Sequence, residues 1–344
     1  MLNNKYKISI CIPTFEGEST LGQTLDSICT QITPEFEVII SDDHSLDRTL
    51  IIASEYAIKY SNIKAFKNED NLGMDKNFHQ CVKYAKGEYI WFCGQDDIFM
   101  DGALAKILEI LDNHSNLGII YLNFTEYDHD LSKCITPSGF ALSGFNVDPN
   151  ENGKEIIVKS SSEYFEMFNA PPTFLPAIIM LRDYWDDPRV DMFYGTNYVQ
   201  TGLILLYMDK RFICVLPKLY IKGRIPSDKW QTNGKQLFYI MTGYLKVNVN
   251  AFKLANNTLP IQTLKKIKLK YLLWLPNLAY KCNELGFRVG KEELKYLENI
   301  FANKFLISLY LKSLLLMPIF IYSFPIKLLK FIINEIKRFI KETL

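Results

Sequence analysis

The chain has 344 residues, a length that predicts about two domains. Hydrophobic residues make up 48% of it, enough for a globular core, and the formal net charge of +1 gives no whole-chain argument for nucleic-acid binding. The seven cysteines are scattered without a C-x-x-C pair. We therefore expect free thiols in a reducing compartment, and neither a disulfide framework nor a zinc site. No long apolar segment follows the first charges, so a secretory signal is not expected.

The first 125 residues alternate between strand and helix signals. Short apolar runs predict strands at residues 7–13, 36–43, 63–66, 88–93 and 118–124. Helical spacing between them predicts helices at about 20–29, 45–59, 74–85 and 102–111, with a capping box at Thr20 and Gln23 and caps at Ser45 and Asp101. This alternation is typical of βαβ units, so we expect an α/β, Rossmann-like fold with a mostly parallel sheet flanked by helices.

The rest of the chain changes character twice. Residues 125 to about 172 are polar and are expected to be irregular, apart from a helix near 162–168. Strand followed by helix is predicted at 174–185, helix at 201–208, and strand with loop at 212–224. Helical patterns dominate after about residue 227. We therefore expect one domain at 1–226 and a helical region at 227–344.

Three of the predicted strands end on polar or aromatic residues. The first ends at 13–15, the second in SDDHS at 41–45, and the fourth in GQDD at 94–97. In an open parallel sheet, ligands bind beyond the carboxyl ends of the strands, so these segments are expected at one edge. That edge would hold Phe15 and four aspartates, namely Asp42, Asp43, Asp96 and Asp97.

The two aspartate pairs have different alternatives. Asp42 and Asp43 are explained equally well by a turn and helix cap, where aspartate is common. Asp96 and Asp97 are better explained by Mg²⁺ or Mn²⁺, which takes one or two carboxylates and completes its shell with substrate phosphate. The segment PTFEGEST has one glycine, and no G-x-x-x-x-G-K-[ST] occurs. A dinucleotide fingerprint and a P-loop are therefore both excluded.

Two blocks of this region resemble family-2 glycosyltransferases of the GT-A fold. ISICIPTFEGESTLGQTLDSICTQ with FEVIISDDHSLDRT resembles the opening of that family, and NLGMDKNFHQCVKYAKGEYIWFCGQDD resembles its middle block. YIWFCGQDD is similar to the bacterial subset of abequosyl- and rhamnosyltransferase-like enzymes of surface polysaccharide assembly. The resemblance covers residues 7–111 well, FLPAIIMLRDYW weakly, and the C-terminal third not at all. It implies a GT-A nucleotide-sugar-binding and catalytic domain at 1–226 with a C-terminal helical extension.

The resemblance also implies how the nucleoside would bind. Pro13, Thr14 and Phe15 would line the base pocket, with Phe15 near a pyrimidine. Asp43 would accept a hydrogen bond from the base.

Further residues would contact the diphosphate and sugar by the same resemblance. Asp97 would hold the Mn²⁺ or Mg²⁺, and Asp96 would face the ribose or the donor sugar. Gln95 replaces the first acid of the usual triplet, which would change the contacts with the donor sugar. A loop and helix start would lie along the nucleotide, through Asn71, Gly73 and Lys76.

The general base cannot be assigned from the sequence. A carboxylate normally takes the proton of the attacking hydroxyl, and the family's base usually precedes a helix on the acceptor side. Gln200 stands near that place, and glutamine cannot act as a base. Asp191 is near in sequence, and Asp186 and Asp187 are other options. Arg224 could reach the diphosphate, although a solvated loop charge is the preferred interpretation.

The end of the chain, from residue 304, is apolar and basic. Residues 306–326 are long enough for a span of about 20 residues, but Lys312, Pro318 and Pro325 interrupt them. We therefore expect an amphipathic helix lying on a membrane surface, with lysines toward anionic headgroups. The alternative is a helical pair that packs on the globular domain or on a second subunit.

The leading hypothesis is therefore a metal-dependent, inverting glycosyltransferase on the inner, cytoplasmic face of the bacterial cell membrane. It would move a sugar from a nucleoside-diphosphate sugar to a lipid-linked or glycan acceptor in O-antigen or capsule synthesis. Expected partners are donor, acceptor, membrane surface and a second copy of the chain, without nucleic acid. The alternatives are a non-catalytic nucleotide-sugar-binding scaffold subunit and a nucleotidyltransferase. The latter would need a glycine-rich basic loop after the first strand, which is not visible.

Overall fold

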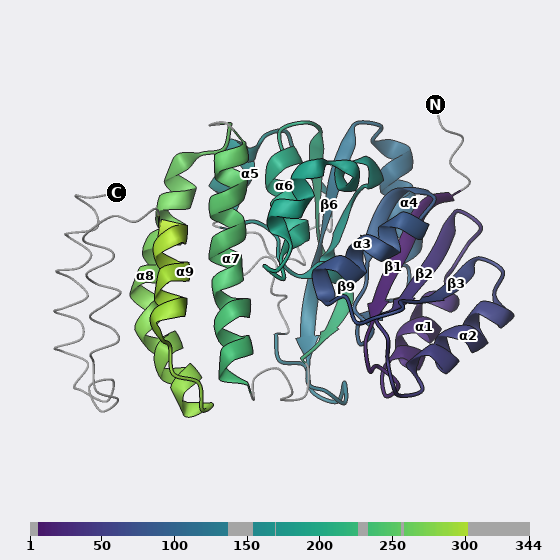
Figure 1. The fold of residues 1–344 in the computed structure, drawn as a ribbon. Coiled ribbons are helices and arrows are strands. Elements are labelled where there is room, and N and C mark those ends of the chain that lie inside the picture. The colour runs from purple at the N-terminus through teal and green to yellow at the C-terminus, as the bar shows by residue number, and fades with distance from the viewer. Residues whose placement is uncertain (1–5, 137–153, 169, 226–232, 256–257, 302–344) are drawn as a thin grey trace. The chain divides into compact units, whose positions relative to one another are not determined.

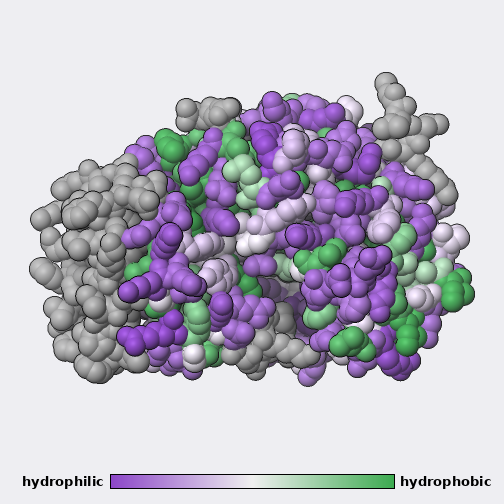
Figure 2. Space-filling model, in the orientation of Figure 1, coloured by the Kyte–Doolittle hydropathy of each residue, from purple (hydrophilic) through white to green (hydrophobic). Residues whose placement is uncertain are grey.

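The computed structural model describes residues 6–136, 154–168, 170–225, 233–255 and 258–301, which Figure 1 draws as a coloured ribbon. The chain divides into two compact units, Met1–Ser227 and Asp228–Leu344. The first unit contains a mixed sheet with helices, and the described part of the second unit is helical. The visible face in Figure 2 is largely hydrophilic, with small hydrophobic patches between polar groups.

The sheet of the first unit runs in the order β3-β2-β1-β4-β8-β6-β9-β5, with β7 paired to β9. Its strands are β1 (Tyr6–Thr14), β2 (Phe36–Asp42), β3 (Ile63–Lys67), β4 (Gly87–Phe92), β5 (Ile98–Phe99), β6 (Leu117–Tyr127), β7 (Ile156–Val158), β8 (Ile178–Leu181) and β9 (Phe212–Arg224). The helices of this unit are α1 (Leu21–Cys29), α2 (Thr49–Lys59), α3 (Met74–Tyr84), α4 (Ala103–Asn113), α5 (Ser161–Met167) and α6 (Val199–Tyr207), with short 3₁₀ turns at Leu175–Ala177, Arg182–Asp186 and Pro188–Phe193.

Strand direction confirms the predicted α/β class. Strands β3, β2, β1 and β4 are mutually parallel, and β6 is parallel to β9. Strand β8 lies between the two groups and is antiparallel to both β4 and β6. The helices that connect parallel strands cover the sheet, and α3 packs against β1 and β2. The strands are therefore apolar along most of their length, and every residue of β2 is buried.

The polar middle of the chain is less irregular than predicted. It contains the short strand β7, which pairs with β9, and β6 continues to Tyr127. The predicted helix near 162–168 is confirmed as α5, where Ser160 accepts a hydrogen bond from the backbone N–H of Glu163. The predicted strand and loop at 212–224 form one continuous strand, β9, through Pro217.

Three predicted helix caps are wrong. The side chain of Thr20 does not cap α1, and the side-chain oxygen of Gln23 instead accepts from Arg224. Ser45 accepts from the backbone N–H of Glu16, and α2 begins only at Thr49. Asp101 does not cap α4, because the cap position is Gly102 with φ of +80°. Gln23 and Ser45 bond to segments distant in the sequence, which a local pattern does not reveal.

The second unit contains α7 (Gly234–Leu254), α8 (Ile261–Glu284) and α9 (Lys291–Phe301). Each is amphipathic and buries aliphatic and aromatic side chains, and α7 packs against both α8 and α9. Among the described helices, none combines the length and the apolar character that crossing a bilayer requires. The segment predicted to lie on a membrane, from about residue 304, falls outside the described residues.

Candidate active site

The carboxyl ends of β1, β2 and β4 lie side by side. Thr14 pairs with Asp42 across β1 and β2, and the backbone N–H of Asp43 donates to the carbonyl of Thr14 (2.8 Å). On the other side of β1, the N–H of Cys93 donates to the carbonyl of Cys11 (3.0 Å). The three predicted segments at 13–15, 41–45 and 94–97 therefore meet at one edge of the sheet, as expected for parallel strands.

Asp42 and Asp43 have separate tasks at this edge. The Asp42 carboxylate accepts from the backbone N–H of Ser45 (3.1 Å). This is the turn that the sequence analysis gave as the alternative to a ligand-binding role. The buried Asp43 carboxylate accepts from the backbone N–H groups of Leu72 (2.8 Å) and Gly73 (2.9 Å). Asp43 thus holds the loop before α3, and its predicted bond to a base would be an additional one.

Two asparagines that the sequence analysis passed over complete this network. The Asn68 side chain donates to Asp43 (2.9 Å) and to Asn77 (3.0 Å). The Asn77 side chain donates in turn to the carbonyl of Ser41 (3.0 Å). Both are buried, so their role is to join the strand ends and α3. The block NLGMDKNFHQ already contained Asn77, but its spacing shows only that it lies one turn into a helix.

The loop before α3 carries the residues predicted to lie along a nucleotide. Asn71 accepts from the N–H of Gly73 (3.0 Å), and Gly73 has φ of +79°, a conformation that favours glycine. Lys76 is exposed in the first turn of α3. The structure therefore brings Asn71 and Gly73 beside Asp43 and leaves the Lys76 ammonium on the surface.

Phe15 and Gln95 are joined by a pair of hydrogen bonds. The backbone N–H of Phe15 donates to Oε1 of Gln95 (2.8 Å), and Nε2 of Gln95 donates to the carbonyl of Phe15 (3.0 Å). Thr14 is buried and Pro13 partly exposed, whereas Phe15 is 45% exposed. The three predicted base-pocket residues follow one another at the end of β1, and of the three only Phe15 is substantially open to solvent.

Asp96 and Asp97 converge on Gly94. A Cβ at Gly94 would lie 2.7 Å from Oδ1 of Asp96 and would also overlap Oδ2 of Asp97. Burial, with the Asp96 carboxylate as second cause, raises the pKa of Asp97 well above its usual value. Burial likewise raises the pKa of Asp96, partly offset by Arg224 and His129. Two close carboxylates of this kind form a region of concentrated negative charge in a low-dielectric setting.

These two carboxylates suit a hard divalent cation. Among the described residues, no group of three or more His, Cys, Asp and Glu side chains is arranged as a complete metal site. Mg²⁺ and Mn²⁺ commonly take one or two carboxylates and complete their shell with phosphate oxygens and water. Asp96 and Asp97 each bring a carboxylate oxygen beside Gly94, so the pair offers that donor set.

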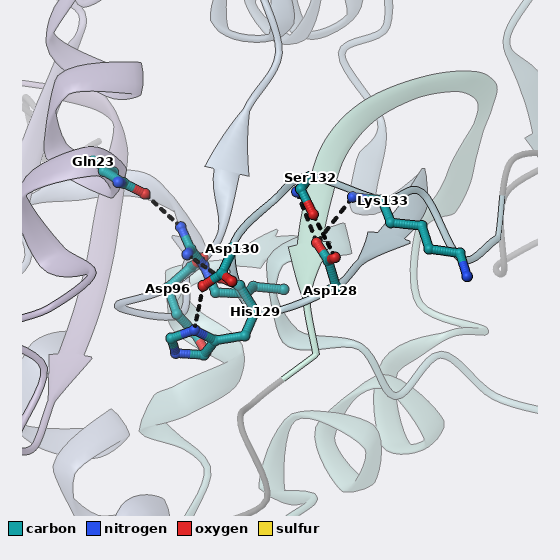
Figure 3. Close-up of polar contacts among 8 residues, drawn as sticks. Gln23, Asp96, Asp128, His129, Asp130, Ser132 and Lys133 are labelled. Carbon is teal, nitrogen blue, oxygen red and sulfur yellow. Dashed lines mark hydrogen bonds and ion pairs between the residues drawn. The ribbon is translucent and has the colours of Figure 1, made fainter.

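Arg224 corrects the interpretation of a solvated loop charge. Its side chain is buried, and Nε donates to the carbonyl of Asp96 (2.9 Å). The guanidinium also donates to the carbonyl of His129 and to Oε1 of Gln23 (2.7 Å). Figure 3 shows Gln23, Asp96 and His129 grouped here. With all these bonds made inside the protein, Arg224 supports the Asp96–Asp97 segment and is not free to reach a diphosphate.

A short loop beside this group is fixed by Asp128. Its carboxylate accepts from the N–H and hydroxyl of Ser132 (both 2.7 Å) and from the N–H of Lys133 (3.0 Å), as Figure 3 shows. His129 follows directly and contacts Asp130 (3.1 Å). The loop therefore presents the His129 carbonyl to Arg224.

Of the four base candidates, Gln200 and Asp187 are bonded within the protein, whereas Asp186 and Asp191 are exposed. Gln200 is buried, and its Nε2 donates to the carbonyl of Thr173 (3.0 Å). Asp187 binds Arg189 and Tyr207, and the Arg189 bond is the first cause that holds the pKa of Asp187 far below its usual value.

Asp75 is a buried carboxylate beside the start of α6 that the sequence analysis missed. One oxygen accepts from the backbone N–H groups of Thr196 (3.1 Å) and Asn197 (3.0 Å), just before α6, and the other is buried without a partner. Burial raises the pKa of Asp75. Asp75 follows the loop at Asn71 and Gly73 directly, so it ties that loop to the start of α6.

Comparison with known proteins supports the resemblance. Residues 9–153 match the sequence model of glycosyl transferase family 2. The chain is 28% identical to the abequosyltransferase RfbV of Salmonella typhimurium over 80% of this chain and 84% of that protein. It is also 28% identical to the GalNAc(5)-diNAcBac-PP-undecaprenol beta-1,3-glucosyltransferase of Campylobacter jejuni, over 70% and 72%. It spans about half the length, 46%, of the putative glycosyltransferase EpsE of Bacillus subtilis, at 30% identity.

Solved structures show the same fold at low identity. TarS 1–349 of S. aureus, in complex with UDP, aligns over 90% of each chain with a TM-score of 0.57 and 18% identity. The mannosyltransferase PcManGT of Pyrobaculum calidifontis, in complex with GDP-Man and Mn²⁺, aligns over 91% of this chain and 86% of that one, with a TM-score of 0.52 and 13% identity. The GT-A fold predicted from the sequence is confirmed, and the family-model match at residues 9–153 agrees with the resemblance to family-2 glycosyltransferases.

Proposed function

We propose that this glycosyltransferase moves a sugar from a nucleoside-diphosphate sugar to a lipid-linked saccharide or glycan acceptor in bacterial surface polysaccharide synthesis. The observation that carries the proposal is the convergence of Asp96 and Asp97 on Gly94, at the sheet edge that also holds Phe15. The relative named as a GalNAc(5)-diNAcBac-PP-undecaprenol beta-1,3-glucosyltransferase supports this class of acceptor, and the relative named as an abequosyltransferase supports sugar transfer. The abequosyltransferase in particular is matched over most of its length.

The proposed donor site consists of a surface for the base, a loop along the nucleotide and a metal site. The exposed phenyl group of Phe15 offers a flat surface for the base, beside Pro13 and Thr14. The loop at Asn71 and Gly73 would lie along the nucleotide, with Lys76 free to approach its phosphates. The ammonium of Lys76 is exposed and has no bonded partner in the described part of the protein, unlike the buried guanidinium of Arg224.

The proposed metal site consists of Asp97, with Asp96 toward the ribose or donor sugar. A bound Mn²⁺ or Mg²⁺ would neutralise the charge that develops on the departing diphosphate. Both carboxylates must be ionised for this task, and Arg224 favours ionisation because its charge lowers the pKa of each. Arg224 also fixes the segment by bonding the Asp96 carbonyl and, through its backbone N–H, the Asp97 carboxylate.

The acceptor side determines which second function must be tested. Gln200 cannot take a proton, and its Nε2 is bound to Thr173, so a non-catalytic nucleotide-sugar-binding subunit is the second candidate. The transferase proposal needs another base, and Asp191 is the exposed carboxylate near that place. Binding at the membrane surface through residues from about 304 is proposed from their apolar and basic composition.

An assay of nucleoside-diphosphate release separates these functions. Purified protein should be incubated with a panel of nucleotide sugars and a lipid-linked acceptor extract, with Mn²⁺ or with EDTA. The proposal expects release from one donor with Mn²⁺, and none in EDTA or in Asp97→Ala. Binding of a donor without release, under every acceptor condition, would favour the binding subunit.

A further inference from the structure

The amide of Gln95 bonds both polar groups of one backbone residue, Phe15. Oε1 accepts the Phe15 N–H at 2.8 Å and Nε2 donates to the Phe15 carbonyl at 3.0 Å. This pattern matches the pair of N–H···O hydrogen bonds that two opposite residues exchange in an antiparallel ladder. Strands β1 and β4 end at Thr14 and Phe92, so the glutamine extends their contact beyond the last backbone pairing.

Glutamine is chemically suited to this double contact. A carboxamide carries one acceptor and one donor group, whereas an ionised carboxylate only accepts and an ammonium only donates. Asparagine has the same groups but is one methylene shorter. The acid that is usual at this position of the family could therefore bond the Phe15 N–H but not its carbonyl.

The surrounding residues hold this arrangement in place. Gly17 leaves room for it, since a Cβ there would lie 2.9 Å from Nε2 of Gln95 and closer still to its other amide atoms. The hydroxyl of Thr24 donates to the backbone carbonyl of Gln95 (3.0 Å). The N–H of Gly17 donates to the hydroxyl of Thr49 (2.7 Å). The backbone around Phe15 is thus bonded on both sides, while the residue as a whole is 45% exposed.

We propose that Gln95 is a positioning residue that fixes Phe15 for stacking against the nucleobase and makes no contact with the donor sugar. The inference rests on the proposed function, because it needs a nucleotide at this edge. Both polar groups of the side chain are already bonded to Phe15, so the amide is held in one orientation. One N–H and one oxygen lone pair remain, and the inferred positioning role does not need them. This differs from the expectation that the residue at 95 changes donor-sugar contacts.

The test compares ligands with and without the sugar. Dissociation constants in Mn²⁺ would be measured by calorimetry for UDP, CDP, dTDP and GDP, and for the nucleotide sugar of whichever diphosphate binds wild type. Gln95→Met keeps the length and removes both hydrogen bonds, and Gln95→Glu keeps only the acceptor. Gln31→Met is the matched control, because Gln31 also bridges backbone groups, those of Ser27, Met100 and Leu104.

We expect Gln95→Met to weaken the diphosphate and its sugar derivative by the same factor, about fivefold to tenfold, as the loss of two net hydrogen bonds suggests. Gln31→Met should leave both constants unchanged. In a Phe15→Leu background, Gln95→Met should cost nothing further, since Gln95 acts through Phe15.

Two results would overturn the inference while leaving the proposed function intact. One is a loss confined to the nucleotide sugar, which would mean that Gln95 contacts the sugar. The other is unchanged binding in Gln95→Met. If wild type bound no nucleoside diphosphate at all, the proposed function would fail and this inference with it.

Discussion

The backbone N–H of Arg224, at the end of β9, donates to Oδ1 of Asp97, just after β4, at 3.1 Å. The same residue uses its guanidinium to hold the Asp96 carbonyl. A strand far along the sequence thus fixes the segment that carries both candidate metal-binding carboxylates.

Asp97 should destabilise the metal-free protein at neutral pH. Burial first, and then Asp96, raises the pKa of Asp97 well above its usual value. A carboxyl with a raised folded-state pKa contributes stability that is complete below the unfolded pKa of about 3.9 and is lost as pH rises through the folded pKa. In EDTA, Asp97→Asn should therefore exceed wild type in unfolding free energy near neutral pH and lose that advantage near pH 4.

Urea unfolding at both pH values measures this difference. Asparagine can still accept the Arg224 N–H, so the variant removes charge more than structure. Asp183→Asn is the control, since the Asp183 side chain is 85% exposed. A pH-independent difference between wild type and Asp97→Asn would contradict the account of the buried charge.

Gly94→Ala should disrupt the pair of carboxylates. Its Cβ would lie 2.7 Å from Asp96 and closer still to Asp97, so both side chains must move. We expect the Mn²⁺-dependent rise in melting temperature to disappear. Gly22→Ala is the matched control, because a Cβ there meets nothing within 4 Å and should stabilise α1 by about 0.5–1 kcal/mol. A normal Mn²⁺ response in Gly94→Ala would contradict the proposed metal position.

Arg224→Met should be strongly destabilising. The change removes the guanidinium that donates to the carbonyls of Asp96 and His129 and to Oε1 of Gln23. These acceptors lie in a buried region, so the loss should lower the free energy of unfolding by about 2–4 kcal/mol. Arg224→Lys keeps the charge but lacks the planar group that reaches all three acceptors, so it should fall between wild type and Arg224→Met. Denaturant midpoints measure the order. Equal stability of all three proteins would show that the buried contacts contribute nothing.

Asp75→Ala should act on turnover more than on nucleotide binding. It frees the N–H groups of Thr196 and Asn197 at the start of α6, the proposed acceptor side. We expect kcat to fall about tenfold, as for the loss of a positioned group worth roughly 1.4 kcal/mol, with the donor dissociation constant little changed. Steady-state kinetics with calorimetry tests the split. A loss of donor affinity alone would place the role of Asp75 in the nucleotide loop.

The local order of the fold could be predicted from the sequence because its signals are local. Apolar runs such as KISICIP and FEVIISDD correspond to β1 and β2, and their parallel packing brings Phe15 and Asp43 to one edge. The insertion of β8 between β4 and β6 could not be predicted in this way, because antiparallel pairing across the sheet leaves no pattern within a short strand.

The candidate site shows the same division. Phe15, Asp43, Asp96 and Asp97 stand at strand ends, so topology alone predicts their meeting. Arg224 was misjudged because its partners come from α1, the segment after β4 and the loop after β6. Asn68, Asn77 and Asp75 were missed for the same reason, since each one bonds to segments that only the folded chain brings near.

The most direct measurement of the central claim is calorimetric titration of UDP, CDP, dTDP and GDP into wild type and Asp97→Ala, with Mn²⁺ and with EDTA. The account predicts that at least one nucleotide binds wild type in Mn²⁺, that EDTA abolishes or greatly weakens this binding, and that Asp97→Ala behaves in Mn²⁺ as wild type does in EDTA. Equal affinity of the two proteins in Mn²⁺ would contradict a diphosphate held through a metal at Asp97.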